Sequence, residues 1–216
     1  MSPLIKIINM SCDLTKGRQR PCKDSVGGLK AVYFIDYGMD GVVMNTTSGT
    51  EDNVAAISGS NTAYRYDLKG NSNLEQTVTS STDTGGTFFE QTLTLVLPKL
   101  TPKDHKELKL ISFARPHIII KDNNDNYFMA GLEHGMDVTG GTISSGAGMG
   151  DLSGYTLTFT GQERAPANFC DISAETDTQL SFSNNGGSAS NVSVVPGAVA
   201  DVDVDDDQSG IPGGGN

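Results

Sequence analysis

The sequence predicts a mainly β protein with a single core and one clear helix. Strand-forming Thr, Val, Ile and Tyr recur between clusters of Gly and Asn throughout its 216 residues. Apolar and polar residues alternate in residues 74–80, 87–97 and 155–160, and a period of two is typical of strands with one wet face. A helix start followed by an apolar stripe occurs clearly in residues 101–114 alone. We therefore expect a β-rich core, with the helix covering one side of its sheet.

The three alternating segments share one pattern, in which apolar residues lie on one face and Thr, with occasional Glu, on the other. The apolar face of residues 87–97 consists of Phe89, Leu93, Leu95 and Leu97. The opposite faces of the three segments carry Glu75, Thr77 and Thr79; Glu90, Thr92 and Thr94; and Thr156, Thr158 and Thr160. Such faces can meet bulk water in an ordinary antiparallel sheet, or line a water-filled channel between subunits. The residues alone favour bulk water.

The predicted helix begins at Thr101, which can cap it, and Pro102 suits the first helical position. Asp104 completes a Thr-x-x-Asp box and favours the positive end of the helix dipole. Leu108 and Ile111 form a short apolar stripe, and Pro116 limits further helix. Residues 118–130 then predict a hairpin with an Asn- and Asp-rich turn, which is turn chemistry rather than a metal site.

The remaining segments predict a three-part organisation. Residues 1–28 form a basic, cysteine-bearing N-terminal arm, residues 29–170 the β domain, and residues 171–216 a Ser/Gly/Asp-rich extension with an acidic tail. Residues 178–182 and 192–195 of that extension can form strands. Within the domain, residues 38–60 are too long for an ordinary connection. Their β-like pieces at residues 42–44 and 54–57 favour an interaction loop or an extra hairpin.

The charge distribution argues against nucleic-acid binding. The net charge is −11, from 15 basic and 26 acidic residues, and eight acidic residues follow Arg164 without any Lys or Arg. Affinity for nucleic acid comes from neutralising phosphates, so an acidic chain without basic patches does not grip it. If the protein meets DNA, we expect a surface past which DNA slides.

Cysteine usage and hydropathy point to a reducing cytoplasm. Cys12, Cys22 and Cys170 are an odd number, and we expect free thiols rather than a disulfide framework. The start of the chain has too short an apolar core for a secretory signal. No apolar run approaches the roughly 20 residues that span a membrane.

No motif predicts catalysis, a cofactor or a metal. Residues 146–150 are Gly-rich but lack phosphate-loop spacing and precede a strand. His105, His117 and His134 have no recognisable nucleophile beside them. The Asp-rich residues 201–207 resemble a calcium loop, yet Asp206 stands where that loop requires Gly. We therefore expect a non-enzymatic protein.

Three sequence segments resemble the tail tube proteins of tailed bacteriophages. They are residues 87–102 with the helix that follows, residues 117–131, and residues 135–167. The resemblance implies a β-sandwich or partial barrel with one flanking helix, assembling into hexameric rings whose inner strands join in a continuous barrel. Stacked rings would form a hollow conduit for DNA ejection, in the tail of a virion made in the host bacterial cytoplasm. Implied partners are further copies of the chain and other tail proteins such as sheath, baseplate or tail terminator, and DNA passing without specific binding.

The resemblance also assigns roles to residues of this chain. It favours Thr faces that line a channel between subunits over Thr faces that meet bulk water. The expected lumen residues are Glu75, Thr77, Thr79, Glu90, Thr92, Thr94, Thr156 and Thr158. The expected contacts between rings are Met39, Val42, Val43, Met44, Val54 and Ile57. The N-terminal arm and the acidic extension depart from the simple family pattern. Alternatives are therefore another virion or injection-machine component, such as a tail-tip, tail-completion or capsid-associated protein, or a non-catalytic β-sandwich binding module.

Overall fold

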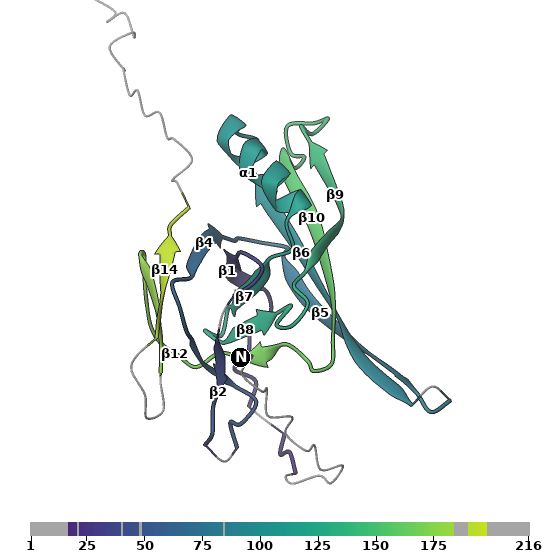
Figure 1. Cartoon of the computed structure of the whole chain (residues 1–216). Coiled ribbons are helices and arrows are strands. Elements are labelled where there is room, and N and C mark those ends of the chain that lie inside the picture. Colours follow the sequence, from purple (N-terminus) through teal and green to yellow (C-terminus); the bar gives the residue numbers. More distant parts are fainter. Residues whose placement is uncertain are drawn as a thin grey trace, which may run out of the picture.

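The computed structural model describes residues 17–183 and 190–197, except residues 21, 40, 48 and 84. Over these residues the chain is mainly β, with fourteen strands and one helix (Figure 1). The strands form an eight-stranded sheet, a four-stranded sheet and a two-stranded hairpin. The predicted fold class, a β-sandwich or partial barrel with one flanking helix, is confirmed. Cys12 and the Asp-rich residues 201–207 lie outside the described residues.

The first sheet is built around β1, whose residues are almost all buried because both of its faces are covered. Its neighbours β4 and β7 both pair with it antiparallel. The strand order across the sheet is β11 (Asn168–Phe169), β8 (Tyr127–Ala130), β7 (His117–Asp122), β1 (Leu29–Ile35), β4 (Thr62–Asp67), β14 (Asn191–Val195), β13 (Gln179–Phe182) and β12 (Ile172–Thr176).

This sheet curls into a half-barrel. Its two edge strands, β11 and β12, are consecutive in the chain and are joined by Cys170 and Asp171. The inside of the curl is an apolar core in which one half of the sheet faces the other. That core includes Tyr33, Ile35, Ile119, Met129, Leu180, Phe182, Val192 and Val194. Cys170 is a buried free thiol at the point of closure, and its burial raises its pKa.

The C-terminal strands are therefore part of the main fold. The sequence placed a domain boundary at residue 170, but β12, β13 and β14 extend the first sheet, and β14 pairs with β4 in parallel. Leu180 and Phe182 of β13 are 0% and 1% exposed. Three strands of the predicted extension therefore belong to the same sheet as strands of residues 29–170.

The second sheet contains β5 (Asn73–Ser81), β6 (Gly86–Pro98), β10 (Gly154–Glu163) and β9 (Asp137–Ser144), in that order. Its apolar face packs on the outer face of the half-barrel. Leu93, Leu95, Leu157 and Phe159 of this sheet share a core with Val32, Phe34, Ile118 and Ile120 of the first sheet. The two sheets thus form a sandwich.

The helix α1 (Pro102–Phe113) begins and ends as the sequence predicts. The Thr101 hydroxyl accepts a hydrogen bond from the amide of Asp104 at 3.1 Å, and Pro102 occupies the first turn. Leu108 is 5% exposed and belongs to the core between the sheets. The Tyr155 hydroxyl donates to the carbonyl of Thr101 at 3.3 Å. The helix therefore lies on the apolar side of the second sheet, away from its Thr face (Figure 1).

Two predicted hairpins are present. In the turn between β7 and β8, the Asp122 carboxylate accepts from the amides of Asn124 and Asn126, each at 2.8 Å, which confirms turn chemistry. The β-like pieces of residues 38–60 form β2 (Val42–Met44) and β3 (Val54–Ile57), which pair antiparallel. All four residues of β3 are buried, so this hairpin is anchored to the half-barrel rather than free.

Candidate functional site: a polar sheet face with two open edges

The structure brings all eight predicted lumen residues together on one face of the second sheet. The register pairs Glu75 with Thr92 and Thr77 with Glu90 across β5 and β6. Thr94 of β6 lies opposite Thr158 of β10. Thr79 and Thr156 lie further along the same face, opposite Phe88 and Val96. The alternation in the sequence therefore identified a single continuous surface, although the role of that surface remains a prediction.

The two faces of this sheet differ as the alternation predicts. Leu93 and Phe159 are 0% exposed on the face that meets the half-barrel. On the other face, Glu90, Thr92, Thr94, Thr156 and Thr158 are half-buried, and Glu75, Thr77 and Thr79 are exposed. The hydroxyls on this second face belong to a surface rather than to the core.

The polar face is wider than the sequence indicated, because β9 also contributes to it. Thr142 of β9 lies opposite Thr156, and Asp137 lies opposite Thr160. The hydroxyls of Thr139 and Thr160 are 2.9 Å apart. The available signal was the interrupted β-like pattern of residues 136–143, but Gly140, Gly141 and a register shift between Thr158 and Phe159 hide its alternation.

The charge of this surface has one sign. The four strands contain no Lys or Arg. The acidic residues on the polar face are Glu75, Glu90 and Asp137, the last by its register with Thr160. A surface of hydroxyls and carboxylates has no cations with which to hold phosphate groups. It can lie beside a polyanion without retaining it.

Both edges of this sheet are open within the described chain. The sheet ends at β5 on one side and β9 on the other. Natural edge strands are usually protected by Lys, Pro, strong bulges or short length. Here β5 has nine residues and β9 has eight, neither contains Lys or Pro, and β9 has one register shift, between Val138 and Gly140. Unpaired backbone groups along such edges favour pairing with another strand.

The distal part of the β5–β6 hairpin projects beyond the body of the protein (Figure 1). Gln76 and Gln91 mark the last anchored position, where Gln76 Oε1 accepts from the amide of Ala167 at 2.7 Å and Gln91 Oε1 from that of Gly131 at 2.9 Å. Beyond it, Val78 is 58% exposed although it lies on the apolar face. This chain leaves the apolar side of the projecting part partly uncovered.

The predicted contacts between rings are only partly available. Val54 and Ile57 are 0% exposed inside the half-barrel, so their side chains are taken out of the predicted contact surface. Met39, Val42 and Met44 are half-buried against the same core. Val43 is 44% exposed and is the member of this set that can contact another molecule directly. The sequence indicated β-like pieces here but did not show that all four residues of β3 would be buried.

The Gly-rich segment and two of the candidate histidines have partners within the fold. In the Gly-rich connection before β10, the amides of Ala147 and Gly148 donate to the Asp151 carboxylate at 3.0 and 2.7 Å. Those amides are thus already paired with an anion. His117 is buried and lies 2.6 Å from the carbonyl of Gly131, whereas His105 is exposed on α1. His105 lies on α1 with its ring beside that of Tyr155, and His117 lies on β7.

The fold and this surface define a mainly β protein with a curled half-barrel, a second four-stranded sheet and, among the described residues, a single helix. Comparison with protein-family models, curated proteins and solved structures finds no match for this chain. The resemblance to tail tube proteins therefore remains a prediction from the sequence. Within the described residues, no helix has the length and apolar character needed to cross a membrane.

Proposed function

We propose that this chain is a non-catalytic structural protein of a bacteriophage tail, assembling into hexameric rings that stack into a hollow tube for DNA ejection. In this assembly, β9 of one copy pairs with β5 of the next. The polar face of the second sheet then lines the lumen. DNA passes along this face without binding to it.

The observation that carries the proposal is the combination of two open edges with one polar face. All neighbouring strands of the second sheet are antiparallel, so β5 and β9 run in opposite directions. A copy related by rotation about an axis along the strands can therefore add its β5 to β9 and continue the antiparallel pattern. Head-to-tail contacts of this kind close into rings when the rotation permits, and a closed ring leaves no edge.

Edge variants observed by negative-stain electron microscopy test the proposal. Val78 on β5 and Ile143 on β9 are 58% and 59% exposed, and Leu110 on α1 is a matched control at 55%. Lysine on an edge strand opposes pairing. We expect rings or tubes from the wild-type protein and from Leu110→Lys, and folded monomers from Val78→Lys and Ile143→Lys. A wild-type protein that stays monomeric at high concentration, or edge variants that assemble normally, would contradict the proposal.

A further inference from the structure

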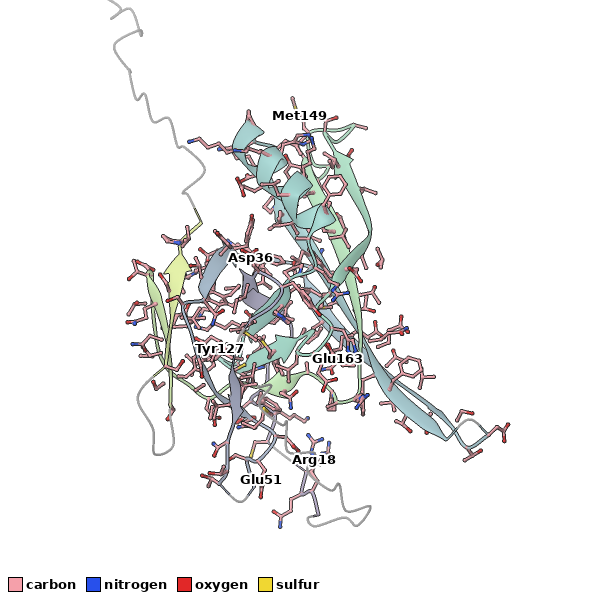
Figure 2. All side chains as sticks on the ribbon, viewed as in Figure 1. Arg18, Asp36, Glu51, Tyr127, Met149 and Glu163 are labelled. Carbon is pink, nitrogen blue, oxygen red and sulfur yellow. The ribbon has the colours of Figure 1, made fainter. Side chains whose placement is uncertain are left out.

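Three side chains capable of binding a metal meet where the turn after β8 contacts the end of β10. Glu133 and His134 lie in this turn, and Glu163 is the last residue of β10. One ligand atom from each residue lies within 4.8 Å of the other two. Glu163 is at one end of β10, and Met149, in the connection that precedes β10, lies near the other end (Figure 2). The Glu163 side chain faces the interior, on the side of the sheet opposite the polar face.

The backbone of the turn fixes the orientation of Glu163. The residue is 4% exposed, and its Oε1 accepts hydrogen bonds from the amides of Glu133 at 3.0 Å and His134 at 2.9 Å. Its other oxygen, Oε2, lies 3.3 Å from Nδ1 of His134. Because the two amides hold one oxygen, the other is presented to the imidazole.

A buried carboxylate is costly unless a positive charge lies beside it. Within the described residues, the basic side chain at ion-pair distance from Glu163 is His134, which is 60% exposed and carries a charge only when protonated. Charge-assisted N–H···O bonds are usually about 2.7–2.9 Å long, so 3.3 Å is long for such a pair. It is close to the roughly 3.4 Å between neighbouring ligand atoms of a tetrahedral ion with bonds of about 2.1 Å.

There is space beside the cluster for water ligands. A cavity of about 50 Å³ is lined by Gln91, Leu132, Glu133, Glu163, Arg164, Ala165 and Asn168. This exceeds the roughly 10–15 Å³ that a cavity needs to hold one water, so the cavity has room for water. A cation bound by Glu133 and Glu163, which both line this cavity, can therefore also take water ligands from it.

We propose that Glu133, His134 and Glu163 bind a divalent first-row metal ion, for which Zn²⁺ is the best match. One imidazole nitrogen with two carboxylate oxygens is a ligand set that Zn²⁺ accepts, whereas Ca²⁺ and Mg²⁺ prefer oxygen alone. The ion neutralises the buried Glu163 and ties the turn at residues 132–135 to the end of β10. This site does not depend on the proposed ring assembly.

Isothermal titration calorimetry with Zn²⁺ tests the site. The full-length chain is first freed of metal with EDTA and kept reduced. The variants are His134→Ala and Glu163→Gln, with His105→Ala, an exposed histidine on α1, as the matched control. Glutamine at position 163 keeps an oxygen for the two amides, so we expect its circular dichroism to match the wild type. We expect one site in the wild type and the control, and at least tenfold weaker binding in the two cluster variants.

Two further measurements test whether the ion is bound at this cluster. Added Zn²⁺ should raise the melting temperature of the wild type and of His105→Ala, but not of His134→Ala. The absorption spectrum with Co²⁺ should lack the intense near-ultraviolet band of a thiolate ligand. Absence of wild-type binding, equal affinity in His134→Ala, or a thiolate band that places the ion on cysteine would each overturn the proposal.

Discussion

Lys121 on β7 and Glu175 on β12 form an ion pair across the inside of the half-barrel, with Nζ 2.5 Å from Oε2. The two strands are not neighbours in the sheet: β12 is one edge strand and β7 lies in the opposite half, so the pair joins the two halves of the sheet. The hydroxyls of Tyr33 and Tyr127 also donate to the Glu175 carboxylate, and Arg65 lies 3.3 Å from it. Four side chains, one each from β1, β4, β7 and β8, thus contact the Glu175 carboxylate. Together they hold the half-barrel closed.

The first prediction is that Glu175 makes the stability of the protein depend on acid pH. Burial raises the pKa of Glu175, but the hydrogen bonds from Lys121, Tyr127 and Tyr33 outweigh it and lower the pKa from 4.5 to about 2. A lowered carboxyl pKa contributes stability that is complete above the unfolded pKa and is lost as pH falls toward the folded pKa. We expect this contribution, on the order of 2 kcal/mol, to disappear between about pH 4.5 and pH 2.

Urea unfolding at a series of pH values measures this contribution. Glu175→Gln should be less stable than the wild type at neutral pH and should lose less stability on acidification. Glu107→Gln, at an exposed position on α1, is the control and should retain the wild-type pH profile. Identical pH profiles for the wild type and Glu175→Gln would contradict this role.

The sequence predicted the second sheet well because the side-chain period of a strand determines which residues share a face. The alternation in residues 87–97 and 155–160 therefore placed Thr92, Thr94 and Thr158 correctly. The signal for the start of α1 was also local, because Thr101, Pro102 and Asp104 lie within four residues of one another. The sequence did not predict that β12, β13 and β14 join the first sheet, for a different reason. The parallel pairing of β14 with β4 joins residues near 193 to residues near 62, and no local pattern reports it.

Long-range juxtapositions also explain what was missed at the candidate sites. Glu163 is separated from His134 by β9 and most of β10, so nothing in the spacing links them. The burial of β3 depends on β13 and β14, whose apolar pieces are short and separated by Ser, Asn and Gly. The open edges are likewise a property of the sheet rather than of any segment. Sequence patterns could identify the faces of individual strands but not which strands would meet.

The second prediction concerns the C-terminal strands. Phe182 on β13 is 1% exposed in the core of the half-barrel. Replacing a buried Phe with Ala typically costs about 3–5 kcal/mol. We expect Phe182→Ala to lose that order of stability in urea unfolding. Deletion of residues 201–216 should leave the melting temperature unchanged. A stable Phe182→Ala variant would contradict the placement of β13, and a large fall on deletion would show that the tail packs on the domain.

The third prediction tests the start of α1. The Thr101 hydroxyl is the side-chain acceptor for the amide of Asp104. Loss of such a cap costs about 1 kcal/mol. Thr101→Ala should therefore reduce the free energy of unfolding by about that amount, and Thr101→Ser, which keeps the hydroxyl, should restore it. If Ser and Ala destabilise the protein equally, the hydroxyl is not responsible.

The fourth prediction tests the polar face as a lumen, by reversing its charge. Glu90 lies on this face near the end of the β6–β10 ladder, opposite Thr77 of β5 on one side and Gln162 of β10 on the other. Glu90→Lys or Thr92→Lys should fold normally, because both positions are half-buried on the side away from the core. A basic lumen would hold phosphates, so we expect slower genome ejection from virions that carry either variant.

The matched control is Glu107→Lys, which makes the same charge change on α1, outside the polar face. DNA retained by purified tubes should increase for Glu90→Lys and fall again as salt is raised, since phosphate contacts weaken with ionic strength. Tubes of Glu107→Lys should release DNA as the wild type does. Equal ejection rates for the wild type and both polar-face variants would show that this face does not meet DNA. Slowing by Glu107→Lys as well would assign the effect to net charge rather than to the lumen.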